Sequence, residues 1–307
     1  MGMYLLRRVT RALITLFVVT VITFTILHTI PANIGWILLG KHATTAKAAA
    51  LDRKLGLTLP LPIQYVRWLV LLIEGGGLLQ NLSLVAPPTL EYLALAGGFA
   101  LLVAVLSATL QALYPGSTLS RWLSAASYIV STIPSFWIGL LLIYIFAMTL
   151  IWLPGNGPYP GPLSQGLVNW LVYMILPAVT LAMPTVAGWS AVFRTAIEEA
   201  LGSDYVRTTR AQGYSEHRIL VRHVLRNSLL PIITIAGMSL PALFNNIVVL
   251  ELIFHMQGLG SALIGSLFAF NYGETVNLVL VIGMITVFGN LLADVLYAVA
   301  DPRIRFS

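Results

Sequence analysis

The sequence predicts an all-α, polytopic membrane protein with six transmembrane helices. Of its 307 residues, 58% are hydrophobic and only 9% are charged, whereas a typical soluble domain has about 25% charged residues. The mean hydropathy is +0.89, and apolar segments of about 20 residues, the length that crosses a bilayer, recur along the chain. These observations argue against an ordinary soluble enzyme. The absence of cysteine excludes disulfides, thiolate nucleophiles and cysteine-bound metals.

The apolar segments and the residues that end them define the six spans. Three arginines, at positions 7, 8 and 11, stand at the beginning of the first span, which ends at Pro31, and the fourth span contains Pro177 and Pro184, which predict kinks. A cleaved signal peptide is the alternative for the first span, but its apolar run is too long and no Ala-x-Ala site follows it. The predicted spans cover residues 9–30, 92–114, 126–150, 168–190, 232–253 and 276–299.

The connection over residues 31–90 is long and contains a second kind of apolar segment. Ile63–Ile73 is interrupted by Gln64 and Arg67 and is too short to span. It predicts an amphipathic helix that lies at the membrane surface. The glycines at 75–77 predict a break after it.

The distribution of basic residues orients the chain. Six spans place both termini on one side, which then holds 12 of the 17 lysines and arginines. The other five lie in the long 31–90 loop, and the loops 151–167 and 254–275 have none. Because cytoplasmic loops carry an excess of lysine and arginine, we predict cytoplasmic N- and C-termini. The net charge of +6 therefore reflects orientation rather than nucleic-acid binding.

Residues 191–231 form the one large polar segment, with six of the 17 basic and four of the 11 acidic residues. A helix over 191–201, a short helix over 205–212 and a third helix up to Pro231 are predicted, with Gly213 ending the second and Ser215 capping the third. Arg218, Arg222 and Arg226 recur at i, i+4 and i+8, the spacing of one helical face. That face is suited either to anionic lipid or to a cytoplasmic protein.

The segments Asp204–Tyr214 (DYVRTTRAQGY) and Arg222–Pro231 (RHVLRNSLLP) resemble the cytoplasmic loop of permeases of ATP-binding cassette (ABC) importers, and more narrowly the dipeptide/oligopeptide/nickel permease family. The resemblance continues in order along nearly the whole chain. It includes residues 61–65, 133–139, 251–260 and 301–303. Thr209 stands where the family usually has alanine, and Gln212 where it usually has lysine.

The resemblance implies a type I ABC importer permease-like fold, with residues 1–307 forming a single transmembrane permease domain in the plasma membrane. Such a chain forms half of a pore for peptides, with nickel or oligosaccharides as alternatives. The implied partners are a second permease subunit, two ATP-binding subunits and an extracytoplasmic solute-binding protein. ATP and magnesium would bind to those partner subunits, and this chain would carry no catalytic, cofactor or metal site.

In such permeases the short helix, here about Ser203–Gln212, sits in a cleft of an ATP-binding subunit. Gly213 would let the chain turn sharply after it, because glycine has no Cβ. By resemblance, the residues of this ATPase-coupling loop are Asp204, Tyr205, Val206, Arg207, Thr208, Arg210, Ala211, Gly213, Arg222, His223, Asn227 and Pro231.

Two acidic residues of the predicted spans have open roles. Glu251 ends the fifth span and begins a Glu-x-x-Phe element, so it either contributes to an outer gate or only marks the interface. Asp294 lies within the sixth span, where a charged residue is a functional candidate or a structurally satisfied carboxylate near the cytoplasmic end.

The sequence contains weaker indications of three other functions. The segment 35–42 matches G-x4-G-K, but His42 replaces the serine or threonine that binds magnesium, and the residues between the glycines are bulky. Ser239 with His255 could suggest a membrane protease, although a small residue in an apolar helix usually serves packing. A self-contained secondary transporter is the main alternative, but it needs more charge inside the membrane.

Overall fold

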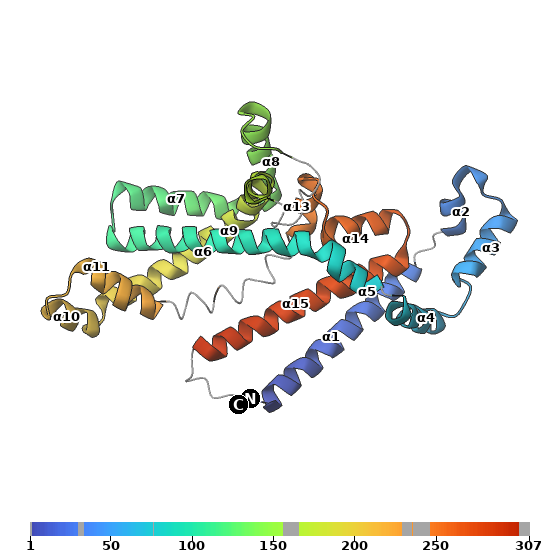
Figure 1. The fold of residues 1–307 in the computed structure, drawn as a ribbon, viewed down its shortest axis with the longest axis horizontal. Helices are drawn as coiled ribbons and strands as arrows, with labels where there is room; N and C mark the ends of the chain where they lie inside the picture. The colour runs from blue at the N-terminus through green and yellow to red at the C-terminus, as the bar shows by residue number, and fades with distance from the viewer. Residues whose placement is uncertain are drawn as a thin grey trace. The chain divides into compact units, whose positions relative to one another are not determined.

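The computed structural model describes residues 2–29, 34–75, 77–155, 166–228, 235 and 246–300 (Figure 1). Every regular element in these ranges is helical, which confirms the predicted all-α fold. The chain divides into two compact units, one formed by residues 1–87 with 257–287 and the other by residues 88–256 with 288–307.

The first unit combines helices from both ends of the chain. The long apolar helix α1 is followed by a series of short helices, and the C-terminal part adds two more. Their bounds are α1 (Gly2–Thr29), α2 (Ile34–Leu39), η1 (Gly40–His42), α3 (Thr45–Leu55), α4 (Leu61–Glu74), α5 (Gly77–Gln80), the π-helical η2 (Asn81–Val85), α14 (Leu259–Phe268) and the first part of α15 (Tyr272–Ala300).

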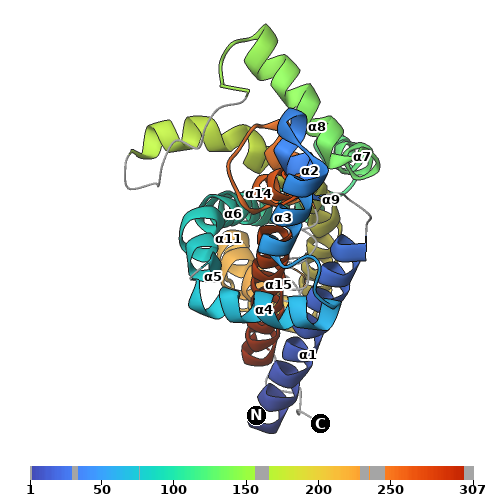
Figure 2. The same ribbon diagram turned by 90° about the vertical axis from the view of Figure 1, so that its right-hand side faces the viewer.

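Helix α4 confirms the amphipathic helix predicted between the first two spans, and it crosses α1 (Figure 2). The hydroxyl groups of Thr20 on α1 and Tyr65 on α4 lie 2.9 Å apart. The ring of Phe24 contacts Tyr65 edge-on at 5.3 Å between centroids. Trp68 and Leu72 on α4 are buried, whereas Ile63 and Ile73 are exposed. One side of α4 therefore packs on the unit and the other is exposed, as in an amphipathic helix.

A polar network joins α4 and η2 to α15. The Trp68 indole N–H donates to Asn277 Oδ1 at 2.8 Å, and the Asn277 amide donates to Glu274 at 3.3 Å. The amide of the buried Asn81 donates to the other oxygen of Glu274 at 2.7 Å. These bonds fix α4 and η2 to the beginning of α15.

The second unit contains the remaining elements. A long helix, α9, connects most of the others. The bounds are α6 (Ala86–Leu113, in this unit from residue 88), α7 (Thr118–Thr132), α8 (Ser135–Leu142), the π-helical η3 (Ile143–Thr149), α9 (Leu167–Gly202), α10 (Asp204–Ala211), α11 (Glu216–Ile219), the π-helical η5 (Leu220–Val224) and α13 (Ile247–Ile253).

The core of this unit contains a row of alanines on α6. Ala96, Ala100, Ala104 and Ala108 are each 0% exposed and recur every four residues, so they form one small-residue face. They belong to the same cluster as buried residues of α9, among them Met174, Leu181, Phe193 and Ile197. Small side chains allow helices to approach closely, which is the usual packing of membrane helices.

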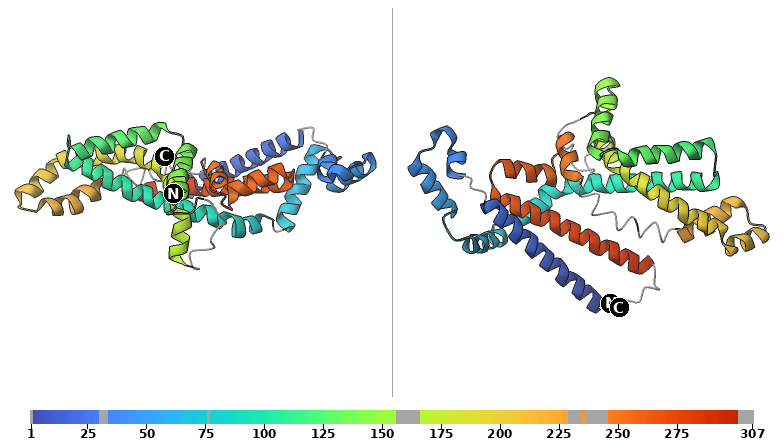
Figure 3. Two further views of the ribbon diagram at one scale, coloured as in Figure 1. Left: turned by 90° about the horizontal axis from the view of Figure 1, so that it is seen from above. Right: turned by 180° about the vertical axis from the view of Figure 1, so that it is seen from behind.

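The span predicted over residues 126–150 is corrected by the structure. It is not one straight helix: α7 ends at Thr132, and the segment Ser135–Thr149 leaves at an angle of 110° (Figure 3). Pro134 explains the break, because proline lacks an N–H donor and disfavours helical backbone at the preceding residue. Ile133 accordingly has extended backbone, with φ −90° and ψ 131°.

Within the described residues, four helices are long and apolar enough to cross a membrane, and five if the bent pair counts as one span. They correspond to the first, second, fourth and sixth predicted spans, with the bent pair in the place of the third. The fifth, over residues 232–253, lies outside the described residues except for Ile235 and 246–253. Six spans and cytoplasmic termini therefore stay predictions.

Gly139 offers a test of the packing in the second unit. A β-carbon at this position of α8 would lie 3.1 Å from Thr180 Cγ2 and 3.3 Å from Phe254 Cε2. We expect Gly139→Leu to lower the free energy of unfolding by about 1–3 kcal/mol, because it overpacks the junction of α8, α9 and the end of α13. Thermal unfolding of the purified chain in detergent measures this loss.

Gly188→Leu is the matched control, since a β-carbon at Gly188 on α9 would meet no atom within 4 Å. Leucine is the better helix former there, so stability should be unchanged or slightly higher. Equal losses in the two variants would contradict the packing described for Gly139.

Candidate functional site

The polar segment after the fourth predicted span forms a helical hairpin at the end of α9 (Figure 1). α9 runs for 36 residues to Gly202, and Ser203 has extended backbone that separates it from α10. α10 ends at Ala211, Gly213 has φ +81°, and α11 begins at Glu216. The short helix and the glycine turn predicted from the sequence are therefore confirmed.

Helix α10 has one buried and one exposed side. Val206 is 0% exposed and belongs to the cluster that contains Phe193 and Ile197 of α9. Ile219 and Val224 join the same cluster, so the returning helix also packs there. The remaining predicted loop residues of α10 are exposed, namely Asp204, Tyr205, Arg207, Thr208, Arg210 and Ala211. The hairpin is thus anchored by apolar contacts and presents a polar surface outward.

Thr209 explains how this chain accommodates a departure from the family pattern. The residue is largely buried, at 8% exposed. Its hydroxyl donates to the carbonyl oxygen of Tyr205 at 2.6 Å, so the additional polar group is satisfied within α10. A buried hydroxyl without such a partner would be costly. Gln212, the other departure, is exposed.

A bidentate ion pair closes the turn around Gly213. Arg210 donates from Nε to Glu216 Oε1 at 2.6 Å and from Nη2 to Oε2 at 3.0 Å. The hydrogen bond from Arg210 lowers the pKa of Glu216, and the same pair raises the pKa of Arg210. The sequence carries no signal for the role of Glu216, because this residue is six positions from Arg210 across a turn, outside the helical spacings that predict ion pairs.

The structure corrects the prediction that Arg218, Arg222 and Arg226 share one α-helical face. Leu220–Val224 is π-helical, so the backbone between Arg218 and Arg226 has i→i+5 hydrogen bonds and does not keep the register of one α-helical face. All three arginines are nevertheless exposed. The Arg218 guanidinium lies 4.8 Å above the Tyr214 ring. His223 is partly buried and its ring contacts Tyr214 edge-on. Asn227 is exposed, and Pro231 lies outside the described residues.

Glu251 lies in a different part of the second unit, within α13. It is 0% exposed, and its Oε1 accepts hydrogen bonds from Thr89 at 2.6 Å and from Tyr92 at 3.2 Å, both on α6. Asp294 falls in the last part of α15, where the structure describes the backbone but not the side chain.

The weaker candidates gain no support. The G-x4-G-K segment forms the short helices α2 and η1, and no strand precedes it among the described residues. Ser239 lies outside those residues. In the described part of the chain, no group of three or more acidic or histidine side chains could hold a metal ion.

Two family models together match nearly the whole chain. Residues 98–306 match the family of binding-protein-dependent transport system inner membrane components, and residues 1–92 match the N-terminal domain of the same membrane components. The oligopeptide transport system permease protein AppB of Bacillus subtilis is 32% identical over 316 residues, with all of both chains covered. A probable peptide ABC transporter permease protein, y4tP of Sinorhizobium fredii, is also 32% identical over both complete chains.

Two solved structures share the fold at low identity. An inward-facing structure of the MetNI methionine ABC transporter has a TM-score of 0.55 and 16% identity, covering 70% of this chain and 93% of that one. A crystal structure of an amino acid ABC transporter has a TM-score of 0.53 and 16% identity, covering 77% and 98%. The family resemblance noted in the sequence is thereby confirmed. The chain belongs to the family of inner-membrane components of binding-protein-dependent transport systems.

Proposed function

We propose that this chain is a permease subunit of an ATP-driven importer for peptides and that α10 couples it to a separate ATPase. The full-length match to peptide permeases supports the substrate class. The observation that carries the coupling role is the exposed polar side of α10, held at the end of α9 by the buried Val206. The proposed partners are a second permease subunit, two ATP-binding subunits and an extracytoplasmic solute-binding protein.

The dimensions of α9 suit the transmission of movement. At about 1.5 Å per residue, its 36 residues extend for about 54 Å, enough to cross the bilayer and continue beyond it. A displacement of α10 by the ATPase would move α9 with it, because the hairpin is packed on the end of that helix. Rigid-body switching of packed helices is an established form of allosteric transition. In this proposal the six spans form a single permease domain with cytoplasmic termini.

Transport in proteoliposomes tests the function as a whole. We expect peptide uptake only when the second permease, the ATPase subunits, the binding protein and ATP are all present. Uptake by this chain alone, driven by an ion gradient, would instead identify a secondary transporter. Omission of each component in turn distinguishes the two.

The turn at Gly213 tests the coupling role. Its φ of +81° strains a β-branched residue, although a β-carbon would meet no atom within 4 Å. We expect Gly213→Val to reduce ATP-dependent uptake at least about tenfold while the assembled complex still hydrolyses ATP, because the strain displaces the hairpin. Gly213→Asn is the matched control, since asparagine tolerates this backbone conformation. Equal uptake by both variants would refute the assignment.

Disruption of the Arg210–Glu216 ion pair should have a second, smaller effect on ATP-dependent uptake. Arg210→Glu or Glu216→Arg alone should weaken ATP-dependent uptake by at most about fivefold, the range that an exposed ion pair supports. The double exchange should recover part of the loss. Because the pKa of Glu216 is lowered, the pair is present at neutral pH and is lost only as the pH falls through that lowered pKa. A double exchange no better than either single variant would show that the pair does not position α10.

Variants of Glu251 distinguish a structural role of this residue from a role in an outer gate. Glu251→Ala removes the acceptor of Thr89 and Tyr92, whose side chains are both buried, and should lower the free energy of unfolding by about 1–3 kcal/mol. Glu251→Gln keeps a side-chain oxygen as acceptor, so we expect near-normal stability and uptake. Normal stability with lost uptake in Glu251→Gln would favour the gate. Thermal unfolding and peptide uptake of both variants decide between the two.

A further inference from the structure

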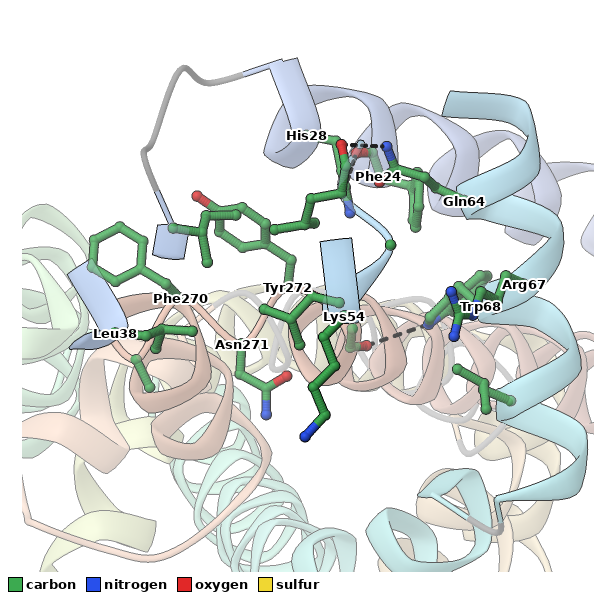
Figure 4. Close-up of a pocket in the computed structure, with 17 residues that line it drawn as sticks. Phe24, His28, Leu38, Lys54, Gln64, Arg67, Trp68, Phe270, Asn271 and Tyr272 are labelled. Carbon is green, nitrogen blue, oxygen red and sulfur yellow. Dashed lines mark hydrogen bonds between the residues drawn. The ribbon is translucent and has the colours of Figure 1, made fainter. Parts of the chain in front are cut away.

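A pocket of about 630 Å³ lies in the first unit, whereas the hairpin belongs to the second (Figure 4). It is lined by the end of α1, α2, the end of α3 and the turn after it, α4, and the connection from α14 to α15. Its volume falls in the range of about 300–1,000 Å³ that is usual for sites of small ligands. Neither the family match nor the relatives assign a ligand to this part of the chain.

The inner wall of the pocket is aromatic and firmly held. Phe24 and His28 on α1 stack with their ring centroids 3.9 Å apart, and the Tyr272 ring lies 5.5 Å from His28. Trp68 is buried, and its N–H donates to Asn277 and to the carbonyl oxygen of Gly273. The wall is therefore formed in advance of any ligand, which lowers the ordering cost of binding.

The rim of the pocket is basic. Lys54 on α3 and Arg67 on α4 are exposed, and no acidic side chain lines the pocket. Arg67 rests on the turn at Gly56, where a β-carbon would lie only 2.7 Å from Nη1. Within the described ranges, neither cation forms an ion pair. Two free cations beside an aromatic wall favour a ligand with an anionic group and an apolar part.

The position of the pocket indicates where such a ligand comes from. The candidate spans of this unit are Arg7–Thr29 and Tyr272–Leu292, so His28 and Tyr272 lie at span ends, where aromatic residues meet the headgroup layer. α4 carries exposed apolar residues, including Ile63 and Val66, as a helix in the membrane surface does. A small soluble anion would contact only the basic rim. A phospholipid has an anionic headgroup for the rim and an apolar part for the aromatic wall and the exposed side of α4.

We propose that this pocket binds the phosphate headgroup of an anionic phospholipid. Lys54 and Arg67 contact the phosphate, and the aromatic wall together with the apolar side of α4 receives the glycerol and the upper acyl chain. The bound lipid fills the space between α1, α4 and the α14–α15 connection and so stabilises the first unit.

Lipid binding to the purified full chain tests the proposal. After removal of bulk lipid in detergent, phosphatidylglycerol or phosphatidylcholine is added, and native mass spectrometry counts the retained molecules. We expect phosphatidylglycerol to be retained in preference to phosphatidylcholine. The double variant Lys54→Gln/Arg67→Gln should weaken its binding by about tenfold. Phe270→Asn, which removes an aromatic side chain of the lining at φ +55°, should weaken it without altering charge.

The matched control is Lys41→Gln/Lys47→Gln, which removes the same charge from exposed positions of the same segment outside the pocket lining. Equal losses of phosphatidylglycerol binding in the two double variants would overturn the proposal. The lipid would then be attracted by the overall positive charge of the segment rather than by the pocket. Inorganic phosphate at equal concentration should not compete. Full competition by it would assign the pocket to a soluble anion instead, and retention of both lipids to the same extent would also overturn it. Helical content by circular dichroism verifies that each variant is folded.

Discussion

Polar side chains on apolar helices need partners within the protein, because the bilayer core offers neither water nor another source of hydrogen bonds. This constraint determines how the helices of each unit are joined. Glu251 accepts from Thr89 and Tyr92, and the Trp170 indole donates to Glu91, so α13 and α9 are both fastened to α6. In the first unit the network from Trp68 through Asn277 and Glu274 to Asn81 fastens α4 and η2 to α15. Apolar contacts are only weakly directional, so polar bonds such as these help to specify which helices pair.

Between Ala96 and Ala108, small and large apolar side chains lie on different sides of α6. The alanine face of α6 is buried, whereas Leu102 and Leu106 on the same helix are 60% and 55% exposed. Large side chains have no advantage in the contact between helices, since lipid solvates them equally well, and small ones let the backbones approach. The exposed leucines are thus suited to lipid or to a partner permease.

The local parts of the fold and of the site follow from the sequence, and the long-range parts do not. α10 and the turn at Gly213 were predictable because a cap, a short amphipathic segment and a glycine are neighbours in sequence. Pro134 carries a local signal for the break between α7 and α8, which a search for apolar length alone overlooks. Trp68 and Asn277 are 209 residues apart, and no spacing rule connects them. The π-helical turn at Leu220–Val224 leaves no clear composition signal, and it alters the register on which the arginine face depended.

A coupling element has to meet two requirements that oppose each other. It must move together with its own subunit, and it must bind and release its partner within each transport cycle. In the coupling role proposed for α10, the two requirements are met on opposite sides of the helix. Val206 attaches α10 to the buried cluster that contains Phe193 and Ile197 of α9, and such apolar contacts are stiff because protein interiors are closely packed. Tyr205 and Arg207 lie on the exposed side, where contacts exchange with water at little net cost and can therefore be made and broken repeatedly. Under this proposal, the hairpin transmits a displacement without being bound permanently by the ATPase that causes it.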